Sequence, residues 1–190
     1  MKYKMPAVIF AGGKSSRMGK DKALLPFSGY KTLAQYQYER LQKLFEVVYL
    51  SAKEDKFDFE AAFIPDRYEI SSPLAGIVTV FETLDVEEVF ILSVDAPFVN
   101  ETVINTLMKK KRQEDDTVIA KTQSGLQPLC GIYRHTVLPL AKTALKENRH
   151  RLTHLLKEVQ SSFVMFEEES LFANLNHPHE YEKALKHLIQ

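Results

Sequence analysis

The chain has 190 residues, a length that suits one domain, and we expect residues 1–190 to form a single domain. Apolar residues make up 45% of the sequence and charged residues 26%, a composition that excludes a disordered chain. Basic and acidic residues number 25 each, so no net charge attracts nucleic acid or an anionic membrane, and we predict neither as a partner.

Short apolar runs predict the strands. They are mostly continuous rather than alternating, which is typical of a sheet that is covered on both faces. The runs are Ala7–Ala11, Val47–Leu50, Val89–Val94, Thr117–Ala120 and Ser162–Phe166.

Three helices are predicted between these runs, each after a residue that can cap it. Thr32 opens the first, which extends to Phe45. Ser72 opens the second, which extends to Leu84 and has Pro73 at its first position, where the missing N–H costs nothing. Asn100 opens the third, which ends on four cations at 109–112 that favour the negative end of the helix dipole. In the first helix the residues expected near one apolar face are Leu33, Tyr36, Leu41 and Leu44.

The order of these elements predicts an α/β fold. Strand and helix alternate from residue 7 to about residue 111, which indicates a Rossmann-like, three-layer α/β/α arrangement with a mainly parallel sheet. Residues 127–190 alternate less clearly and predict a small antiparallel part with covering helices. Ligands of such sheets bind beyond the carboxyl ends of the strands, where the loop after residue 11 and Asp95 are both expected.

The cysteine content points to a compartment. Cys130 is the single cysteine and cannot form an internal disulfide, which is typical of a reducing environment. No run approaches the roughly 20 apolar residues of a membrane span, and the first apolar run is shorter than the roughly 7 residues of a signal-peptide core. We therefore expect a cytoplasmic protein.

The segment AVIFAGGKSSRMGKDKALLPF (7–27) has the character of an anion site. A strand stops at two glycines, and four cations follow, of which Arg17 offers a fork and Lys22 a point charge. The glycines and Ser15 allow backbone N–H groups to approach a phosphate. The spacing matches neither a P-loop nor a GxGxxG dinucleotide fingerprint. A glycine-rich turn with solvated lysines is the alternative.

FAGGKSSRMGKDKALLPF resembles the opening signature of the nucleotidyltransferases that join an NTP to a phosphorylated small molecule, and it is most similar to that of the molybdenum cofactor guanylyltransferases. The pair Gly12-Gly13 has the guanylyltransferase form, whereas cytidylyltransferase relatives read LAAG. Later segments resemble this family in the same order: IPDRYEISSPLAGI, SVDAPFV, LQPLCGIYR and NLNHPHEYEKA. Departures from the family pattern fall at Ser72, Gln127, His177 and His179.

The resemblance implies a function, transfer of GMP from GTP to molybdenum-loaded molybdopterin with release of pyrophosphate. It implies Mg²⁺ as cofactor, bound by Asp95, and molybdopterin-handling proteins and molybdoenzyme chaperones as further partners. Arg17, Lys22 and Asp95 would be catalytic. The residues that would bind the nucleotide are Phe10, Ala11, Gly12, Gly13, Ser15, Lys22, Ser51, Asp66 and Asp95. Those that would bind molybdopterin are Asn174, Asn176, Arg149 and Arg151.

Structural interpretations of the same residues remain open. Asp66 can belong to a surface turn, Asp95 can cap a turn, the two asparagines can stabilise a loop, and the two arginines can lie in a solvated helix start. Another nucleotidyltransferase, acting with CTP or on a sugar phosphate, is the alternative enzyme. A non-catalytic nucleotide-binding chaperone is the alternative from another class.

Overall fold

The computed structural model describes residues 1–13 and 19–187. Within these ranges the strands form one sheet, and each strand is identified by its bounds. The strands are β1 (Ala7–Phe10), β2 (Val48–Ala52), β3 (Ala62–Pro65), β4 (Glu88–Ser93), β5 (Thr117–Thr122), β6 (Gly125–Arg134) and β7 (Ser161–Met165).

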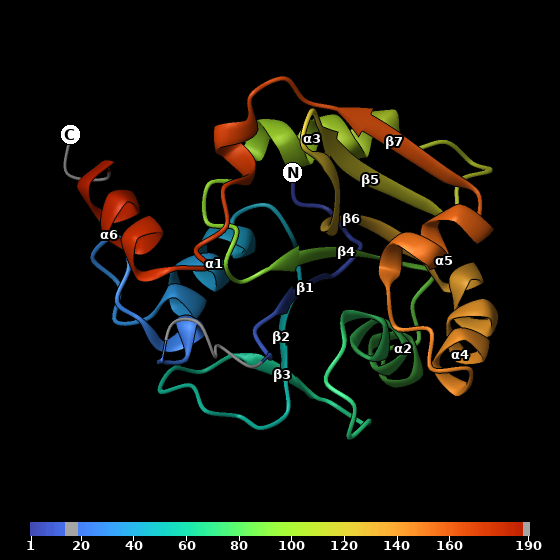
Figure 1. Cartoon of the computed structure of the whole chain (residues 1–190), viewed down its shortest axis with the longest axis horizontal. Coiled ribbons are helices and arrows are strands. Elements are labelled where there is room, and N and C mark those ends of the chain that lie inside the picture. The colour runs from blue at the N-terminus through green and yellow to red at the C-terminus, as the bar shows by residue number, and fades with distance from the viewer. Residues whose placement is uncertain (14–18, 188–190) are drawn as a thin grey trace.

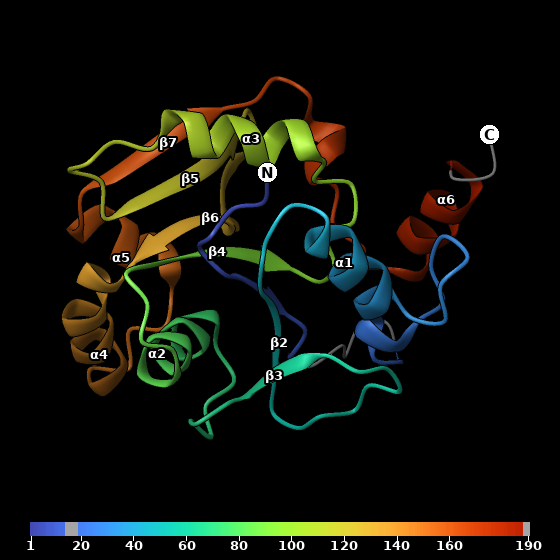
Figure 2. The same ribbon diagram turned by 180° about the vertical axis from the view of Figure 1, so that it is seen from behind.

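The sheet order is β3-β2-β1-β4-β6-β5-β7 (Figures 1 and 2). The four strands β3, β2, β1 and β4 are parallel, and β7 is parallel to β5. Among the strands of the described ranges, β6 alone is antiparallel to its neighbours, β4 and β5. The mainly parallel sheet and the antiparallel strand in the C-terminal part are therefore confirmed.

The helices begin where their capping residues predict. Thr32, Ser72 and Asn100 each accept a hydrogen bond from a backbone N–H of the first turn, and Pro73 occupies the first position of its helix. The helices are α1 (Leu33–Gln42), α2 (Pro73–Thr83), α3 (Glu101–Lys110), α4 (Leu138–Lys146), α5 (Leu152–Glu158) and α6 (Pro178–His187), with 3₁₀ turns η1 (Lys22–Leu24), η2 (His135–Val137) and η3 (Glu169–Phe172).

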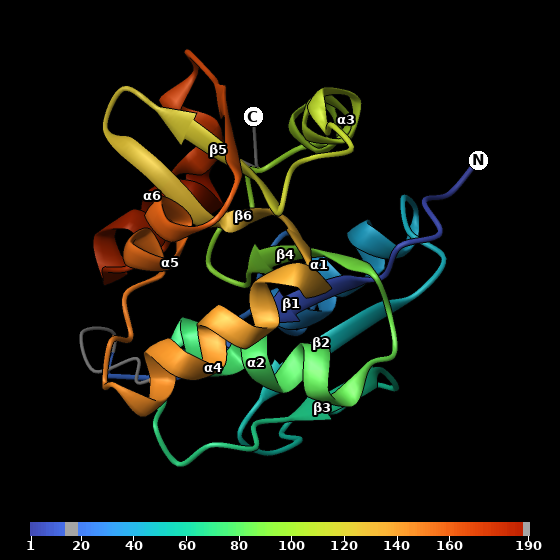
Figure 3. The ribbon, with the colours of Figure 1, turned by 90° about the vertical axis from the view of Figure 1, so that its right-hand side faces the viewer.

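The core has one apolar cluster on each face of the sheet. Ala7 and Ile9 of β1 pack in a cluster with α1 and α3, whereas Val8, which points to the other face, packs in a cluster with α2, α4 and α5. Figure 3 shows α2 and α4 side by side on their face. This three-layer arrangement confirms the predicted fold class. In the described parts of the chain, no helix combines the length and the apolar character needed to cross a bilayer.

The sequence analysis missed one strand and extended the first helix too far, to Phe45 instead of Gln42, although Leu33, Tyr36, Leu41 and Leu44 do pack in one apolar cluster. β3 was not predicted, because it has only four residues and ends in a proline at the edge of the sheet. The buried face of α1 includes Gln37 and Tyr38, whereas Tyr36 and Leu44 are only partly buried. Leu44 lies beyond the last residue of the helix, and Gln37 is buried because its amide has hydrogen-bond partners inside the protein.

Candidate active site

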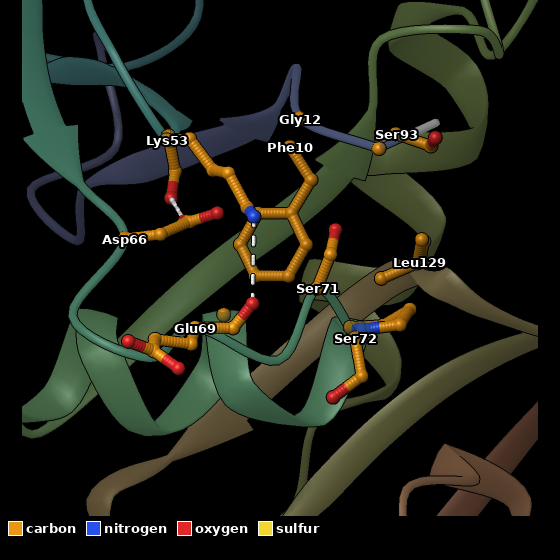
Figure 4. Close-up of a pocket in the computed structure, with 13 residues that line it drawn as sticks. Phe10, Gly12, Lys53, Asp66, Glu69, Ser71, Ser72, Ser93 and Leu129 are labelled. Atoms are coloured by element: carbon orange, nitrogen blue, oxygen red, sulfur yellow. Dashed lines mark hydrogen bonds between the residues drawn. The ribbon is translucent and has the colours of Figure 1, made fainter. Parts of the chain in front are cut away.

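The carboxyl ends of β1, β2, β3 and β4 meet at one edge of the sheet, where a cavity of about 420 Å³ opens. Parallel strands place the residues that follow them at a common edge, which is where open α/β sheets bind ligands. The cavity is lined by Phe10, Gly12, Gly13, Ser51, Lys53, Asp66, Glu69, Ser71, Ser72, Pro73, Gly76, Ser93 and Leu129 (Figure 4).

Glycines shape one wall of this cavity, hereafter the larger cavity because a smaller one adjoins it. A methyl group on Gly76 would lie 2.8 Å from the Phe10 ring, so the ring can lie against α2 because position 76 has no side chain. A methyl group on Gly12 would contact the Cα atom of Ala52 at 3.4 Å and the Asp66 carboxylate at 3.6 Å, ordinary contact distances. Gly13 has a φ of 122°, a conformation that side-chain-bearing residues rarely adopt.

Asp66 follows β3 directly and presents its carboxylate to the cavity. Ser51 of β2 donates a hydrogen bond to it at 3.4 Å. Burial raises the pKa of Asp66, and the hydrogen bond from Ser51 and the charges of Lys53 and Lys56 oppose this rise. Lys53 extends past Asp66 and donates to the backbone carbonyl of Glu69 at 3.4 Å (Figure 4). The cavity is therefore lined by a hydrogen-bond acceptor on Asp66, a hydroxyl on Ser51 and a cation on Lys53.

Lys22 and Asp95 are 73 positions apart in the sequence and form an ion pair. The Lys22 Nζ atom lies 2.7 Å from Oδ2 of Asp95 and 2.9 Å from Oδ1 of Asn176. The side chains of Lys22 and Asp95 are each 17% exposed. Ser93 donates to the other carboxylate oxygen of Asp95 at 2.6 Å. Lys22 begins η1, which Asp21 caps by accepting from the N–H of Ala23. A cation, a carboxylate and an amide thus converge at one point.

The C-terminal segment reaches this point through backbone contacts. The N–H of Leu175 donates to the carbonyl of Asp95 at 2.9 Å, which holds residues 174–176 against the loop after β4. Glu180 of α6 accepts from the N–H groups of Asn176 and His177 at 2.7 and 2.8 Å. These bonds fix the backbone on both sides of Asn176, so its side chain can accept from Lys22.

A second, smaller cavity of about 190 Å³ adjoins the first, and Ser93 and Leu129 line both. Asp95, Asn174 and Gln127 are among its other lining residues. Gln127 is one of the positions at which the sequence analysis noted a departure from the pattern of the family it resembles. Ser93, which donates a hydrogen bond to Asp95, therefore lies between the two cavities. Two adjoining cavities can hold two substrates side by side.

The remaining predicted site residues have different surroundings. Ala11 is buried, and its carbonyl accepts from the Lys56 ammonium at 3.1 Å. Ser15 and Arg17 lie outside the described residues. Arg149 forms ion pairs with Glu147 at 2.8 Å and Glu158 at 2.6 Å. Arg151 lines a further hollow together with Pro73 and Leu129, which also line the larger cavity.

Several residues near the cavities were not singled out from the sequence. Lys53 and Lys56 follow β2 by one and four residues, and proximity to a strand end is the signal that could have identified them. Gly76 and Leu129 lie within segments that the resemblance covers, and only the packing in three dimensions brings them to the cavity.

The donor set at Asp95 fits a small divalent cation. An ionised carboxylate has about four lone-pair sites, of which Lys22 and Ser93 use two. Hard cations such as Mg²⁺ are commonly held by one or two carboxylates together with phosphate oxygens and waters. Over residues 1–13 and 19–187 no group of three or more His, Cys, Asp or Glu side chains could hold a metal, so Asp95 would share the ion with a ligand.

A three-layer α/β fold with a polar cavity beyond its parallel strands, and a lysine–aspartate pair beside that cavity, defines a nucleotidyltransferase-like protein. Residues 7–162 match the MobA-like NTP transferase domain. The chain belongs to this family, whose members are nucleotidyltransferases that generally use a divalent metal.

Similarity to known proteins extends over most of the chain. A molybdenum cofactor guanylyltransferase of Campylobacter jejuni subsp. jejuni is 40% identical over 178 residues, which is 93% of each chain. One of Helicobacter pylori is 34% identical over 188 residues, 96% of this chain and 92% of that one. The crystal structure of molybdopterin-guanine dinucleotide biosynthesis protein A from Archaeoglobus fulgidus superposes with a TM-score of 0.82 at 20% identity, covering 96% and 97%, and shares the fold.

Proposed function

We propose that this protein transfers GMP from GTP to molybdenum-loaded molybdopterin, forming the guanine dinucleotide of the cofactor and pyrophosphate. The names of the relatives that are 40% and 34% identical support this reaction. The observation that carries the proposal is the bonding of Lys22 to both Asp95 and Asn176, beside a wall shared by two cavities. A transferase of this kind needs a cation between a nucleotide and an acceptor.

The larger cavity would hold the nucleotide. The residues from Phe10 to Gly12 would contact the guanine and ribose, with Ser51 and Asp66 beside them in the same cavity. The half-buried Asp66 carboxylate is an acceptor that suits the N–H donors of guanine. Ser15 and Arg17 would wrap the triphosphate, and this role rests on the resemblance of the opening segment.

The reaction would be attack by a phosphate oxygen of the acceptor on the α-phosphorus of GTP, with pyrophosphate as the leaving group. An anionic phosphate oxygen needs no general base, so the protein must supply alignment and charge neutralisation. Lys22 would exchange its bond to Asp95 for phosphate oxygens. Asp95 would hold Mg²⁺, whose charge would stabilise the reacting phosphates.

The smaller cavity would receive the acceptor. Asn174 lines it and Asn176 lies beside it, so both amides are available to molybdopterin or its metal. Arg151, which shares lining partners with the nucleotide cavity, would meet the acceptor phosphate. Arg149 would have to exchange its bonds to Glu147 and Glu158 to do the same. Molybdopterin-handling proteins and molybdoenzyme chaperones would deliver and receive the cofactor in the cytoplasm.

Gly12 would contribute to base choice. An alanine at this position would place a methyl group 3.6 Å from the Asp66 carboxylate, in the space proposed for the base. The contact distances are ordinary, so the Gly12→Ala variant should fold. It should lose part of its preference for GTP over CTP, measured as the ratio of kcat/KM for the two nucleotides. An unchanged ratio would remove Gly12 from base selection.

Direct assay of turnover tests the proposal. The protein is incubated with GTP, Mg²⁺ and molybdenum-loaded molybdopterin, and GMP is measured after mild hydrolysis of the product. Asp95→Asn keeps the size of the side chain but removes the charge, so it should retain the fold and lose most turnover. A purely turn-capping aspartate predicts full activity in that variant, because asparagine caps almost as well.

A further inference from the structure

Two polar side chains of α1 donate hydrogen bonds to the backbone of the loop that carries Asp95. This loop, residues 93–99, connects the end of β4 to the start of α3. Gln37 donates from Nε2 to the carbonyls of Ser93 and Val94, at 3.4 and 3.3 Å. Arg40 donates from Nη1 to the carbonyl of Val99. The two side chains therefore contact both ends of the loop.

Gln37 and Arg40 are also joined to each other. Arg40 donates from Nη2 to Oε1 of Gln37, so the Gln37 amide is oriented by a donor on one side and by loop carbonyls on the other. Gln37 is fully buried. Together the two residues form a polar pair, hereafter the Gln37–Arg40 pair, that connects the beginning and the end of the Asp95 loop.

Arg40 is partly buried, and no acidic side chain in the described parts of the chain pairs with it. Within the same parts of the chain, its Nε atom is buried without a hydrogen-bond partner. Its guanidinium lies 5.6 Å from the centre of the Tyr36 ring. Burial lowers the pKa of Arg40. An apolar residue of similar volume would serve packing at lower cost, so stability alone does not account for an arginine here.

We propose that the Gln37–Arg40 pair is a positioning device that sets the path of residues 93–99, and thereby the orientation of the Asp95 carboxylate toward the divalent cation and Lys22. This inference rests on the proposed role of Asp95. Neither residue lines either cavity, so both act through the loop and not through contact with substrate.

Variants of both residues separate positioning from packing. Gln37→Met and Arg40→Met keep much of the volume and remove the donors, and Arg40→Lys keeps the charge. Arg134 offers a control, since it also donates to backbone carbonyls of a loop, those of Arg112 and Gln113, and pairs with Glu88. It is the last residue of β6 and lines neither cavity. Arg134→Met should lower thermal stability while leaving kcat of the folded protein unchanged.

The expected result is a fall in kcat of about 10-fold or more for Gln37→Met and Arg40→Met, because small misplacements of reacting groups cost up to about 100-fold. KM for GTP should stay within about threefold, and Arg40→Lys should recover part of kcat. In an Asp95→Asn background, Arg40→Met should add less than about a twofold loss, because residues acting through one group are not additive. A full additional loss in that background, or equal losses in Arg134→Met, would overturn the proposal.

A metal-binding measurement keeps this inference separate from the proposed reaction. Mn²⁺ binding in the presence of GTP, followed by electron paramagnetic resonance, should weaken by about threefold or more in Gln37→Met and should be unchanged in Arg134→Met. If the wild-type protein bound Mn²⁺ with GTP but transferred no GMP, the proposed reaction would fail while the positioning role stood. Unchanged Mn²⁺ affinity in both Gln37→Met and Arg40→Met would refute the positioning role. Because two variants of α1 are measured, Mn²⁺ binding by one remains informative if the other fails to fold.

Discussion

Replacing Gly76 by alanine should damage nucleotide binding without unfolding the protein. The added methyl group would lie 2.8 Å from Cε2 and 3.0 Å from Cζ of the Phe10 ring, closer than such atoms approach. The contact involves the far end of a side chain and not the backbone, so the ring can move. It would move away from α2 and into the larger cavity, which Phe10 and Gly76 both line.

The magnitudes follow from this geometry. The ring must shift by about 0.6 Å to reach an ordinary contact of about 3.4 Å. Overpacking of this kind costs about 1–3 kcal/mol, and alanine in place of glycine inside a helix returns about 1 kcal/mol. The net change in the free energy of unfolding should therefore stay below about 2 kcal/mol. KM for GTP should rise about 10-fold, equivalent to about 1.4 kcal/mol of lost binding.

Steady-state kinetics with varied GTP, alongside thermal melts, measures both quantities. A double variant with Phe10→Leu gives the control, because a shorter side chain leaves room for the methyl group. The double variant should have a lower KM for GTP than Gly76→Ala alone if the ring is responsible. A Gly76→Ala protein with wild-type KM, or a double variant with no recovery, would refute this account of the cavity wall.

Three other predictions concern charge and burial. Lys22→Ala should lower kcat/KM about 100-fold, or roughly 2.7 kcal/mol, with the fold retained; near wild-type turnover would contradict a role at the phosphates. Because burial raises the pKa of Asp66, the folded state gains stability below the unfolded value of about 3.9 and loses it as the pH rises through the folded-state value. Asp66→Asn should therefore raise the melting temperature at pH 7 and lose this advantage toward pH 4, as thermal melts would detect; equal shifts at both pH values would contradict the burial effect. Burial raises the pKa of Cys130 to about 12, so iodoacetamide at pH 8 should label it only in denaturant, and rapid labelling of the native protein would argue against its burial.

Local signals in the sequence predicted much of the fold. Thr32, Ser72 and Asn100 cap helices through bonds that span only three residues, so their role can be read from neighbouring positions. Continuous apolar runs predicted a sheet covered on both faces, and the ends of those runs placed Asp95 and the opening glycines at one edge. That residues 1–190 form one domain stays a prediction.

Long-range contacts could not be predicted in the same way. The bond between Lys22 and Asn176 joins residues 154 positions apart, and nothing in either segment specifies the partner. Arg149 lies among acidic residues that can pair with it, and its ion pair with Glu158 depends on how α5 packs. Gln37 lies in a stretch of α1 with several polar residues, so the sequence does not indicate that it is buried. Its burial is explained by its hydrogen bonds to the carbonyls of Ser93 and Val94.

Labelled GTP gives the most direct test of guanylyl transfer. The protein is supplied with molybdenum-loaded molybdopterin, Mg²⁺ and GTP carrying radioactive phosphorus at either the α or the γ position, with unlabelled CTP in excess. The account predicts that α-label enters the molybdopterin product despite the CTP, and that γ-label leaves as pyrophosphate. Release of γ-label as inorganic phosphate, transfer of γ-label to the acceptor, or suppression of α-label incorporation by CTP would contradict it.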